Sequence, residues 1–472
     1  MNELTKLTAR EAVARLKAGE VSPLELIDAA QARIAETDGA INALPTLCLD
    51  RGREHAKRLM DDPPTDPPPG YLYGLPIAVK DLVNVAGVRT TQGSPLFADF
   101  VPESSDILVE TLERNGAVVI AKSNTPEFGA GSHSFNEVFG HTHNPWNPRL
   151  SAGGSSGGAA AALAAGQVWL ATGSDLGGSL RNPASFCSVV GLRPSPGRVA
   201  HGPGALPFND MPVDGPMGRN TGDVALMLDA QTGHDARDPL SMAAPAAPFV
   251  DAVERPVAPR RVAFSPDLGI TPVDPEVAEI CAKAARDFAD LGAAVEDDCI
   301  DFTGAYDIFN VLRAHMFEAG KGELLEHRDQ LKPEVIWNIE VGRELNGPEV
   351  GRALRARGAL YKRAVKFFET FDLLLCPAAI VPPFDGQMRW PNEVAGVTFE
   401  HYIDWLLICG AVTLTGCPAI SVPCGFTADG RPVGLQIVGP PRGEAAVLSA
   451  AALFEAAHDF AAMVPIDPKP AR

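Results

Sequence analysis

The sequence predicts an α/β protein in which helices cover both faces of a large, mixed and mostly parallel β-sheet. Two segments, residues 75–82 and 117–121, are predominantly apolar on both sides of an extended chain, which is typical of buried central strands. A helical segment, residues 106–115, separates them, and Gly116 ends it. A strand, a helix and a second strand at this spacing indicate an α/β sheet that is covered on both sides.

Composition limits what the protein can bind. The chain has 472 residues, of which 46% are apolar and 21% are charged, the balance of an ordinary globular protein. Its formal net charge is −19. Binding to nucleic acid or to an anionic membrane depends on basic surfaces, so we expect no partner of either kind. A small neutral molecule is the expected ligand.

Cysteine and histidine usage argues against a metal centre. None of the eight cysteines has Cys-x-x-Cys spacing, and the ten histidines form no zinc-like cluster with them. We expect reduced cysteines and no cofactor. Residues 1–20 lack the apolar region of a signal peptide, and the alanine-rich residues 157–170 are too short to span a bilayer. A cytoplasmic protein is the expectation.

The N-terminal region is predicted to be helical. Two capping boxes, Thr8 with Glu11 and Ser22 with Glu25, each mark the start of a helix. A third helix is expected over residues 50–60.

Strands and helices continue to be predicted beyond residue 258. The expected elements are a strand over 261–264, a helix over 276–291, mostly helix over 306–370, strands over 419–424 and 433–438, and a helix over 444–460. Asp429-Gly430, between the last two strands, is typical of a tight hairpin.

Two glycine- and serine-rich stretches, one around Ser155 and one around Ser179, are predicted to meet in space. Between them, residues 159–165 form a helix of roughly 10 Å. Residues 168–172 form a strand of roughly 16 Å that must run back over that helix. The glycines beside both serines expose consecutive N–H groups, which is what an oxyanion hole requires.

Other interpretations of these stretches fit less well. A flexible glycine-serine loop would explain the glycines alone, and a phosphate-binding loop lacks its Gly-Lys-Ser/Thr. Residues 153–157 match Gly-x-Ser-x-Gly, the nucleophile elbow that follows a strand in α/β-hydrolases. We expect residues 144–149 not to form a strand because they contain two prolines, so the elbow interpretation is disfavoured.

Lys80 is the candidate general base for a serine nucleophile. It shares a face of the predicted strand with Ala78 and Leu82, so its amine enters an apolar interior. Burial lowers the pKa of a lysine, and a neutral amine can accept a proton. A lysine paired with a carboxylate is the alternative, and Lys122, at the end of the other buried strand, is a competitor.

An ordered set of motifs resembles the amidase signature family of serine hydrolases. The set consists of Lys80, Gly153-Gly-Ser-Ser-Gly-Gly158, Gly173-Ser-Asp-Leu-Gly-Gly-Ser-Leu-Arg-Asn-Pro183 and Gly191-Leu-Arg-Pro194. The resemblance covers nearly the whole chain and is weakest between about 235 and 370. It implies the amidase-signature fold and an amidase that cleaves carbon–nitrogen bonds without a metal or other cofactor.

The resemblance also implies roles for individual residues. The catalytic triad would be Ser179, the nucleophile, Ser155, in a cis peptide bond, and Lys80. The oxyanion would be held by the backbone N–H groups of Leu176, Gly177, Gly178 and Ser179. Asp175 and Arg181 are expected to be structural supports.

Substrate binding is expected to involve Gly129 and Gly131, where larger side chains would narrow the acyl pocket. Tyr402 and Trp405 are expected in an apolar or aromatic lining, and Tyr306, Phe309 and Met316 are further candidates, although residues of these types more often belong simply to the core. Such a pocket suits an aryl or alkyl amide, a carbamate, as a urethanase would cleave, or an ester.

The resemblance implies a single amidase domain over residues 1–472. Its signature core covers about 70–230, a more variable helical segment on the substrate side covers about 258–400, and C-terminal strands and a helix cover 415–460. The expected assembly is a monomer or homodimer. Two alternatives stay open, namely the glutaminase subunit of a tRNA-dependent amidotransferase and a catalytically idle binding protein on the same fold.

Overall fold

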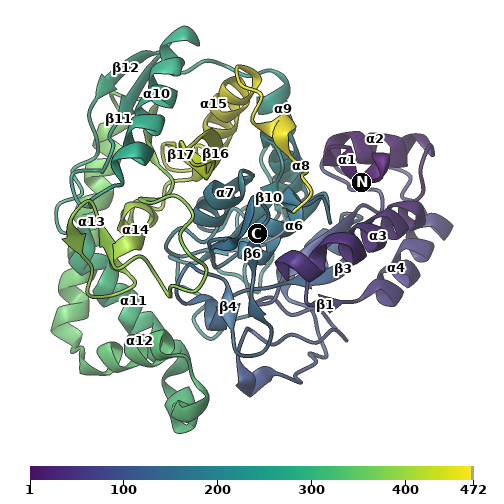
Figure 1. Ribbon diagram of the computed structural model, residues 1–472, viewed down its shortest axis with the longest axis horizontal. Helices are drawn as coiled ribbons and strands as arrows, with labels where there is room; N and C mark the ends of the chain where they lie inside the picture. Colours follow the sequence, from purple (N-terminus) through teal and green to yellow (C-terminus); the bar gives the residue numbers. More distant parts are fainter. Residues whose placement is uncertain (469–472) are drawn as a thin grey trace.

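One continuous sheet of 11 strands forms the centre of the structure, a computed structural model that describes residues 1–468 (Figure 1). In sheet order the strands are β1 (Thr46–Leu47), β3 (Val118–Ser123), β2 (Pro76–Lys80), β8 (Leu170–Asp175), β10 (Val213–Gly218), β9 (Val190–Arg193), β16 (Ala419–Phe426), β17 (Pro432–Val438), β13 (Leu373–Pro377), β11 (Arg261–Phe264) and β12 (Ala294–Asp297).

Fifteen α-helices surround this sheet in the described residues. They are α1 (Glu3–Lys6), α2 (Ala9–Ala18), α3 (Pro23–Ile41), α4 (Leu49–Asp61), α5 (Ile107–Arg114), α6 (Gly157–Ala164), α7 (Arg181–Cys187), α8 (Thr221–Gln231), α9 (Phe249–Glu254), α10 (Pro275–Asp290), α11 (Ala305–Lys321), α12 (Pro333–Glu344), α13 (Gly347–Phe367), α14 (Leu407–Leu414) and α15 (Glu444–Ala456). Both predicted capping boxes are present at the starts of α2 and α3. The expected mixed α/β class is therefore confirmed.

The sheet is mixed, as predicted, but the expectation that it is mostly parallel is wrong. Four neighbouring pairs are parallel, β2 with β3 and β8, and β11 with β12 and β13. The other six pairs are antiparallel. The unit β8–α7–β9 accounts for two of these antiparallel pairs: its two strands run in the same direction, but β10 lies between them and pairs antiparallel with both.

Helices cover both faces of the sheet, as the pattern of buried residues along β13 shows. Leu373 and Leu375 belong to a hydrophobic core that includes residues of α10 and α15. Leu374 and Cys376 belong to a second core with residues of α11, α13 and α14. Since alternate residues of a strand point to opposite faces, the two cores lie on opposite sides of the sheet.

The segment before the first glycine-rich stretch differs from its prediction. Strand β6 (His143–Asn144) pairs with β7 (Asn147–Ser151) in a two-stranded ribbon outside the main sheet. Pro148 is tolerated there because a strand of such a ribbon has an unpaired edge. The prediction that residues 144–149 form no strand is therefore wrong, although they join no central sheet.

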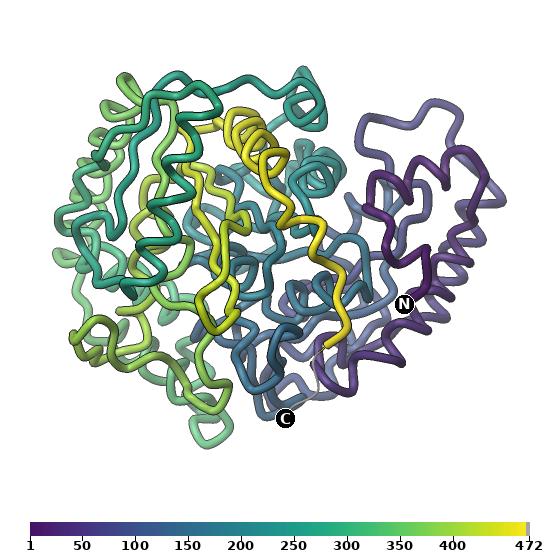
Figure 2. The backbone as a smooth tube through the Cα atoms, turned by 45° about the horizontal axis from the view of Figure 1, so that its top comes forward, coloured from purple at the N-terminus to yellow at the C-terminus, as the bar shows by residue number. Residues whose placement is uncertain are grey.

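The N-terminal helices α1 and α2 lie on the opposite side of the molecule from α11 to α13 (Figure 1). After α15 the chain runs back towards the N-terminal helices (Figure 2). Ile466 N–H donates to Ala164 O at 2.9 Å, and Arg33 donates to Ile466 O at 2.8 Å. No helix in the described part of the chain is long and apolar enough to cross a membrane.

Candidate active site

The candidate site lies where two parallel strands end together. Lys80 is the last residue of β2, and Ser174 and Asp175 end the neighbouring strand β8. The carboxyl ends of parallel strands meet at one edge of a sheet, so polar side chains there converge. Lys80 N–H also donates to Thr172 Oγ1 at 3.0 Å, which fixes the strand end.

Three serine hydroxyls surround the amine of Lys80, which is fully buried. Lys80 Nζ lies 2.7 Å from Ser155 Oγ, 2.9 Å from Ser156 Oγ and 2.9 Å from Ser174 Oγ. Among the described residues, no carboxylate forms an ion pair with Lys80. The alternative that Lys80 is simply a lysine paired with a carboxylate is therefore not what the structure shows.

Burial changes the protonation of this amine. Desolvation lowers the pKa of Lys80 to about 7, although the negative charges of Asp214 and Asp175 act in the opposite direction. An amine with this pKa is largely neutral slightly above pH 7, and a neutral amine can accept a proton.

Lys122, the competing lysine, has a different environment. Its Nζ lies 3.1 Å from Asp81 Oδ1 and donates to Val83 O at 2.7 Å and to Thr90 Oγ1 at 2.8 Å. A buried ion pair with further hydrogen bonds is a structural arrangement. In the described structure Lys122 Nζ contacts none of the three serine hydroxyls that surround Lys80.

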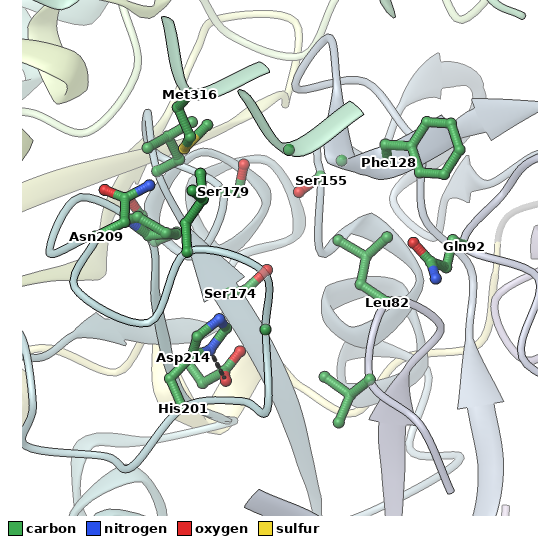
Figure 3. A pocket seen from close by; sticks show the side chains of 18 of the residues that line it. Leu82, Gln92, Phe128, Ser155, Ser174, Ser179, His201, Asn209, Asp214 and Met316 are labelled. Carbon is green, nitrogen blue, oxygen red and sulfur yellow. Dashed lines mark hydrogen bonds and ion pairs between the residues drawn. The ribbon is translucent and has the colours of Figure 1, made fainter. Parts of the chain in front are cut away.

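The helix–strand unit between the two serine-rich stretches brings them together, as predicted. Helix α6 starts after Ser156, and β8 leads back to the loop that carries Ser179. Ser156 N–H donates to Ser179 O at 3.3 Å. The Gly154–Ser155 peptide bond is cis, as the resemblance implies. Ser155 and Ser179 both line one cavity (Figure 3).

Asp175 organises the loop that leads to Ser179. Its carboxylate accepts the N–H groups of Gly178 and Leu180, each at 3.0 Å. Arg181 donates to the same carboxylate through Nε at 3.0 Å and Nη2 at 2.7 Å. Burial alone would raise the pKa of Asp175, but the positive charges of Arg181 and Arg193 hold it well below its usual range. These contacts are those expected of structural supports.

The four expected oxyanion-hole N–H groups are not equivalent. That of Gly178 already donates to Asp175 and is turned away from a ligand. Within residues 1–468, the N–H groups of Leu176, Gly177 and Ser179 have no protein partner. These three N–H groups are therefore free to bind an oxyanion. Gly178 instead stabilises the conformation of the loop, in which its φ of 108° favours glycine.

The cavity in front of the serines has a volume of about 590 Å³, the size of a small-molecule site. Gly129 and Gly131 both line it, as expected. A Cβ atom on Gly129 would lie 3.3 Å from Ser155 Oγ and 3.1 Å from Leu82 Cδ1. A larger side chain at residue 129 would therefore crowd the serine itself.

The two aromatic residues expected in the lining lie elsewhere in the structure. Tyr402 and Trp405 are not among the residues that line the cavity. Trp405 packs against Phe186 and Phe384 in the core, and its neighbour Leu406 is the residue of this helical turn that lines the cavity. Tyr402 lies one residue behind the lining, where its hydroxyl accepts a hydrogen bond from Arg313.

The three further aromatic and apolar candidates also differ from one another. Met316 lines the cavity. Phe309 lies behind Gly177, where a Cβ atom would be 3.1 Å from the Phe309 ring. Tyr306 is exposed and donates to Asp404 Oδ1 at 2.7 Å.

Sequence reasoning missed several polar residues of the site. Ser174 had a usable signal, because it lies two residues after Thr172 on β8 and therefore on the same face towards Lys80. His201 and Asp214 had none. They come from a loop and from β10, and His201 Nδ1 lies 2.7 Å from Asp214 Oδ2 at the cavity wall (Figure 3). Asp214 raises the pKa of His201 to about 9.

The described residues contain no group of three or more His, Cys, Asp or Glu side chains that could hold a metal ion. The groups gathered beside Ser155 are hydroxyls and the amine of Lys80 instead. Such a set suits acyl transfer by a serine nucleophile.

Comparison with known proteins shows that the chain is similar to amidases. A protein-family model described as Amidase matches residues 25–448. The acylamidase of Rhodococcus erythropolis is 36% identical over 466 residues, covering 98% of this chain and 97% of the relative. A glutamyl-tRNA(Gln) amidotransferase subunit of Synechococcus sp. (strain RCC307) is 33% identical, with 96% of this chain and 98% of the relative covered.

A solved structure is similar over the same length. The crystal structure of a bacterial aryl acylamidase of the amidase signature enzymes family superposes with a TM-score of 0.89 at 28% identity. The match covers 99% of this chain and 100% of that one.

Proposed function

Because this chain belongs to the amidase signature family and is an amide-hydrolysing enzyme, we propose that it cleaves its substrate through an acyl-enzyme on Ser179. One observation carries the proposal. The fully buried amine of Lys80 lies 2.7 Å from Ser155 Oγ, without a carboxylate partner among the described residues. A serine hydroxyl is a weak nucleophile by itself. A buried, neutral amine next to Ser155 would activate Ser179 by accepting its proton through Ser155.

The first step is proton transfer along the three triad residues. Neutral Lys80 Nζ accepts the proton of Ser155 Oγ, and Ser155 in turn takes the proton of Ser179. Ser179 Oγ then attacks the carbonyl carbon of the amide. The pKa of Lys80, about 7 because of burial, allows this transfer near neutral pH.

The second step is stabilisation of the tetrahedral intermediate. The N–H groups of Leu176, Gly177 and Ser179 would bind the oxyanion, since these three lack protein partners in the described chain. Asp175 and Arg181 would act as structural supports that hold the loop in shape before substrate arrives.

The remaining steps return the relay to its starting state. The proton on Lys80 passes back through Ser155 to the leaving nitrogen, and the carbon–nitrogen bond breaks. Water then attacks the acyl carbon on Ser179, with the same relay accepting its proton. The products are a carboxylic acid and an amine, or carbon dioxide, an alcohol and an amine from a carbamate.

A small amide is the proposed substrate. The cavity of about 590 Å³ accommodates an aryl or alkyl amide or a carbamate, and an ester would react through the same acyl-enzyme. Amide hydrolysis by the similar acylamidase and aryl acylamidase supports the first of these classes.

A serine-reactive fluorophosphonate tests the nucleophile. We expect it to label Ser179 in the wild-type protein, with the adduct placed by peptide mass spectrometry. Ser179→Ala should neither be labelled nor hydrolyse 4-nitroanilides, while its thermal unfolding stays close to wild type. Labelling of Ser155 in a Ser179→Ala protein that keeps its hydrolytic rate would show that the nucleophile is Ser155 instead.

The glutaminase component of an amidotransferase is the second candidate function, because glutamyl-tRNA(Gln) amidotransferase subunits are similar over nearly the whole chain. A component of this kind works with partner proteins. Amide hydrolysis by the purified chain, with no ammonia released from glutamine, would count against this candidate. An absence of fluorophosphonate labelling would instead support an idle binding protein.

The same proposal covers domain organisation and assembly. We treat residues 1–472 as a single amidase domain, of which the last four residues lie outside the described part. Strands of its signature core, its variable segment and its C-terminal part join one sheet. We further propose that the protein is a cytoplasmic monomer or homodimer that binds neither nucleic acid nor a membrane. Light scattering of the purified protein tests the assembly.

A further inference from the structure

One face of helix α11 forms a wall of the cavity. The lining residues Arg313, Met316, Phe317, Gly320 and Lys321 are spaced at three and four residues, which places them in one stripe along the helix. The stripe therefore presents two cations with apolar and small residues between them.

Two of the cations that line the cavity, Arg313 and Lys321, have no ion-pair partner among the described residues, and Arg313 is the more deeply buried. Only 4% of its surface is exposed, and no described carboxylate forms an ion pair with it. His201 is paired with Asp214 at 2.7 Å, and Arg237 is paired with Glu110 at 2.6 Å. A buried cation without an anion is costly, so the absence of a protein partner needs an explanation.

The guanidinium of Arg313 is nevertheless held in place. Its Nη2 donates to Tyr402 Oη, which also lies 2.6 Å from Asn338 Nδ2. The charged end lies 4.6 Å from the centre of the Phe317 ring and 5.5 Å from that of Tyr402. Its Nε, by contrast, has no hydrogen-bond partner in the described structure. Arg313 is thus positioned by the rings and keeps donors free.

We propose that the cavity selects amides that carry a carboxylate group, and that Arg313 binds this carboxylate. The inference rests on the proposed function and adds the substrate class. A carboxylate matches the planar fork of a guanidinium and forms paired, charge-assisted hydrogen bonds with it. Asp106 and Asp214 also line the cavity and would repel further negative charge on a ligand. A substrate with one carboxylate therefore suits the cavity better than a substrate with two.

Lys321 is the other cation of the stripe and cannot share the same group. Eight residues along a helix correspond to roughly 12 Å, so one carboxylate contacts one of the two cations. Lys321 Nζ lies 4.2 Å from the centre of the Phe128 ring, and burial lowers its pKa to about 8. Arg313 presents a planar fork of donors and is the more deeply buried of the two.

Matched pairs of substrates test the assignment. The 4-nitroanilides of butanoic and hexanoic acid are neutral, and the mono-4-nitroanilides of succinic and adipic acid are their carboxylate counterparts. We expect kcat/KM of the wild type to be higher for the acid of at least one pair. Arg313→Gln should lower the ratio of acid to neutral kcat/KM about 10- to 150-fold, the range of a charged hydrogen bond.

Three variants accompany this measurement. Arg313→Lys should restore part of the ratio, because the positive charge remains but the fork is lost. Arg355→Gln is the matched control, since Arg355 is an exposed arginine of α13 outside the cavity lining, and it should leave the ratio unchanged. Lys321→Gln should lower the ratio less than Arg313→Gln does.

A binding measurement needs neither turnover nor a folded Arg313 variant. Calorimetry of the wild-type protein with 4-phenylbutanoate and with its neutral analogue 4-phenylbutan-1-ol, which has no bond to hydrolyse, should show tighter binding of the carboxylate by at least tenfold. Equal binding, or a preference for the neutral compound in every pair, would overturn the inference. So would a preference that Lys321→Gln removes and Arg313→Gln keeps.

Different results would contradict the proposed function and the carboxylate inference. A chain that is not labelled by fluorophosphonate and hydrolyses none of the four anilides would contradict the acyl-enzyme. The calorimetric comparison would still decide whether the cavity selects a carboxylate. A labelled enzyme that cleaves the neutral anilides faster would keep the proposed function and reject the inference.

Discussion

Lys80 Nζ lies 2.7 Å from Ser155 Oγ and reaches it from the end of a central strand, 75 positions earlier in the chain. The contact joins β2 to the start of α6 and is completely removed from solvent on the lysine side. Because burial lowers the pKa of Lys80 to about 7, we expect this contact to make the reaction rate dependent on pH.

The first prediction concerns that dependence. Burial lowers the pKa of Lys80 to about 7, so the protonated and inactive form dominates below pH 7 and the neutral base dominates above it. We expect kcat/KM to rise with pH up to about 7 and to level off above it. A pH profile with a neutral anilide, between pH 5 and 9, measures this.

Substitution of the lysine separates a base from a fixed charge. Lys80→Ala and Lys80→Arg should both lower kcat by about 10²- to 10⁴-fold, the contribution of a positioned base, because guanidinium does not give up its proton. A Lys80→Arg enzyme that keeps the wild-type rate would contradict the proton relay.

Lys122 provides a matched control for a buried lysine. Lys122→Met leaves Asp81 buried without its ion-pair partner at 3.1 Å, so the free energy of unfolding should fall by about 3–5 kcal/mol. Turnover per active site should change by less than about tenfold, since Lys122 Nζ donates to Val83 O and Thr90 Oγ1 and to no serine of the proposed relay. Urea denaturation and kcat, with active sites counted by fluorophosphonate, measure both. A large loss of kcat with unchanged stability would argue for a catalytic Lys122.

Asp175→Asn tests the support of the oxyanion loop. The change removes the carboxylate that holds the N–H groups of Gly178 and Leu180 and that faces Arg181. We expect kcat to fall by about 10²-fold, comparable to the loss of one oxyanion donor, with KM changed much less. Steady-state kinetics with a neutral anilide measures the two constants separately.

Asp229→Asn is the control for that change. Asp229 also accepts two backbone N–H groups, those of Phe249 at 2.6 Å and Val250 at 3.0 Å, but it lies outside the cavity. The Asp229→Asn enzyme should have a lower free energy of unfolding and an unchanged kcat. Equal effects of the two substitutions on kcat would mean that Asp175 acts only through general stability.

Removal of metal ions should leave the rate unchanged. No group of three potential protein ligands exists in the described residues, and the proposed base is an amine. Hydrolysis is to be measured after treatment with 1,10-phenanthroline and dialysis. A loss of activity that added zinc restores would contradict this prediction.

Local sequence patterns predicted the individual elements well because their determinants are local. The capping boxes at Thr8 and Ser22 start helices where expected, and the apolar segment around Lys80 is a fully buried strand. The hairpin at Asp429-Gly430 joins β16 to β17. Capping, apolar runs and turn residues each act within a few positions of the chain.

Sheet order and pocket lining could not be predicted in the same way because distant segments determine them. Strand β10 lies between β8 and β9, so each of these two strands has an antiparallel neighbour instead of pairing parallel with the other. No local sequence pattern predicts this insertion. Tyr402 and Trp405 were expected in the lining from residue type alone. Arg313 reaches the cavity because α11 packs there, and its lack of an ion-pair partner emerges only in three dimensions.

The buried cluster around Asp175 carries more positive than negative charge. Arg181 and Arg193 both contact this one carboxylate, and all three side chains are inaccessible to solvent. Burial lowers the pKa of Arg193 to about 10, which still leaves it charged at neutral pH. A surplus of one positive charge therefore lies in a medium of low polarity beneath the loop of Leu176 and Gly177. An oxyanion formed there would meet an attractive field that is already oriented, in addition to its hydrogen bonds.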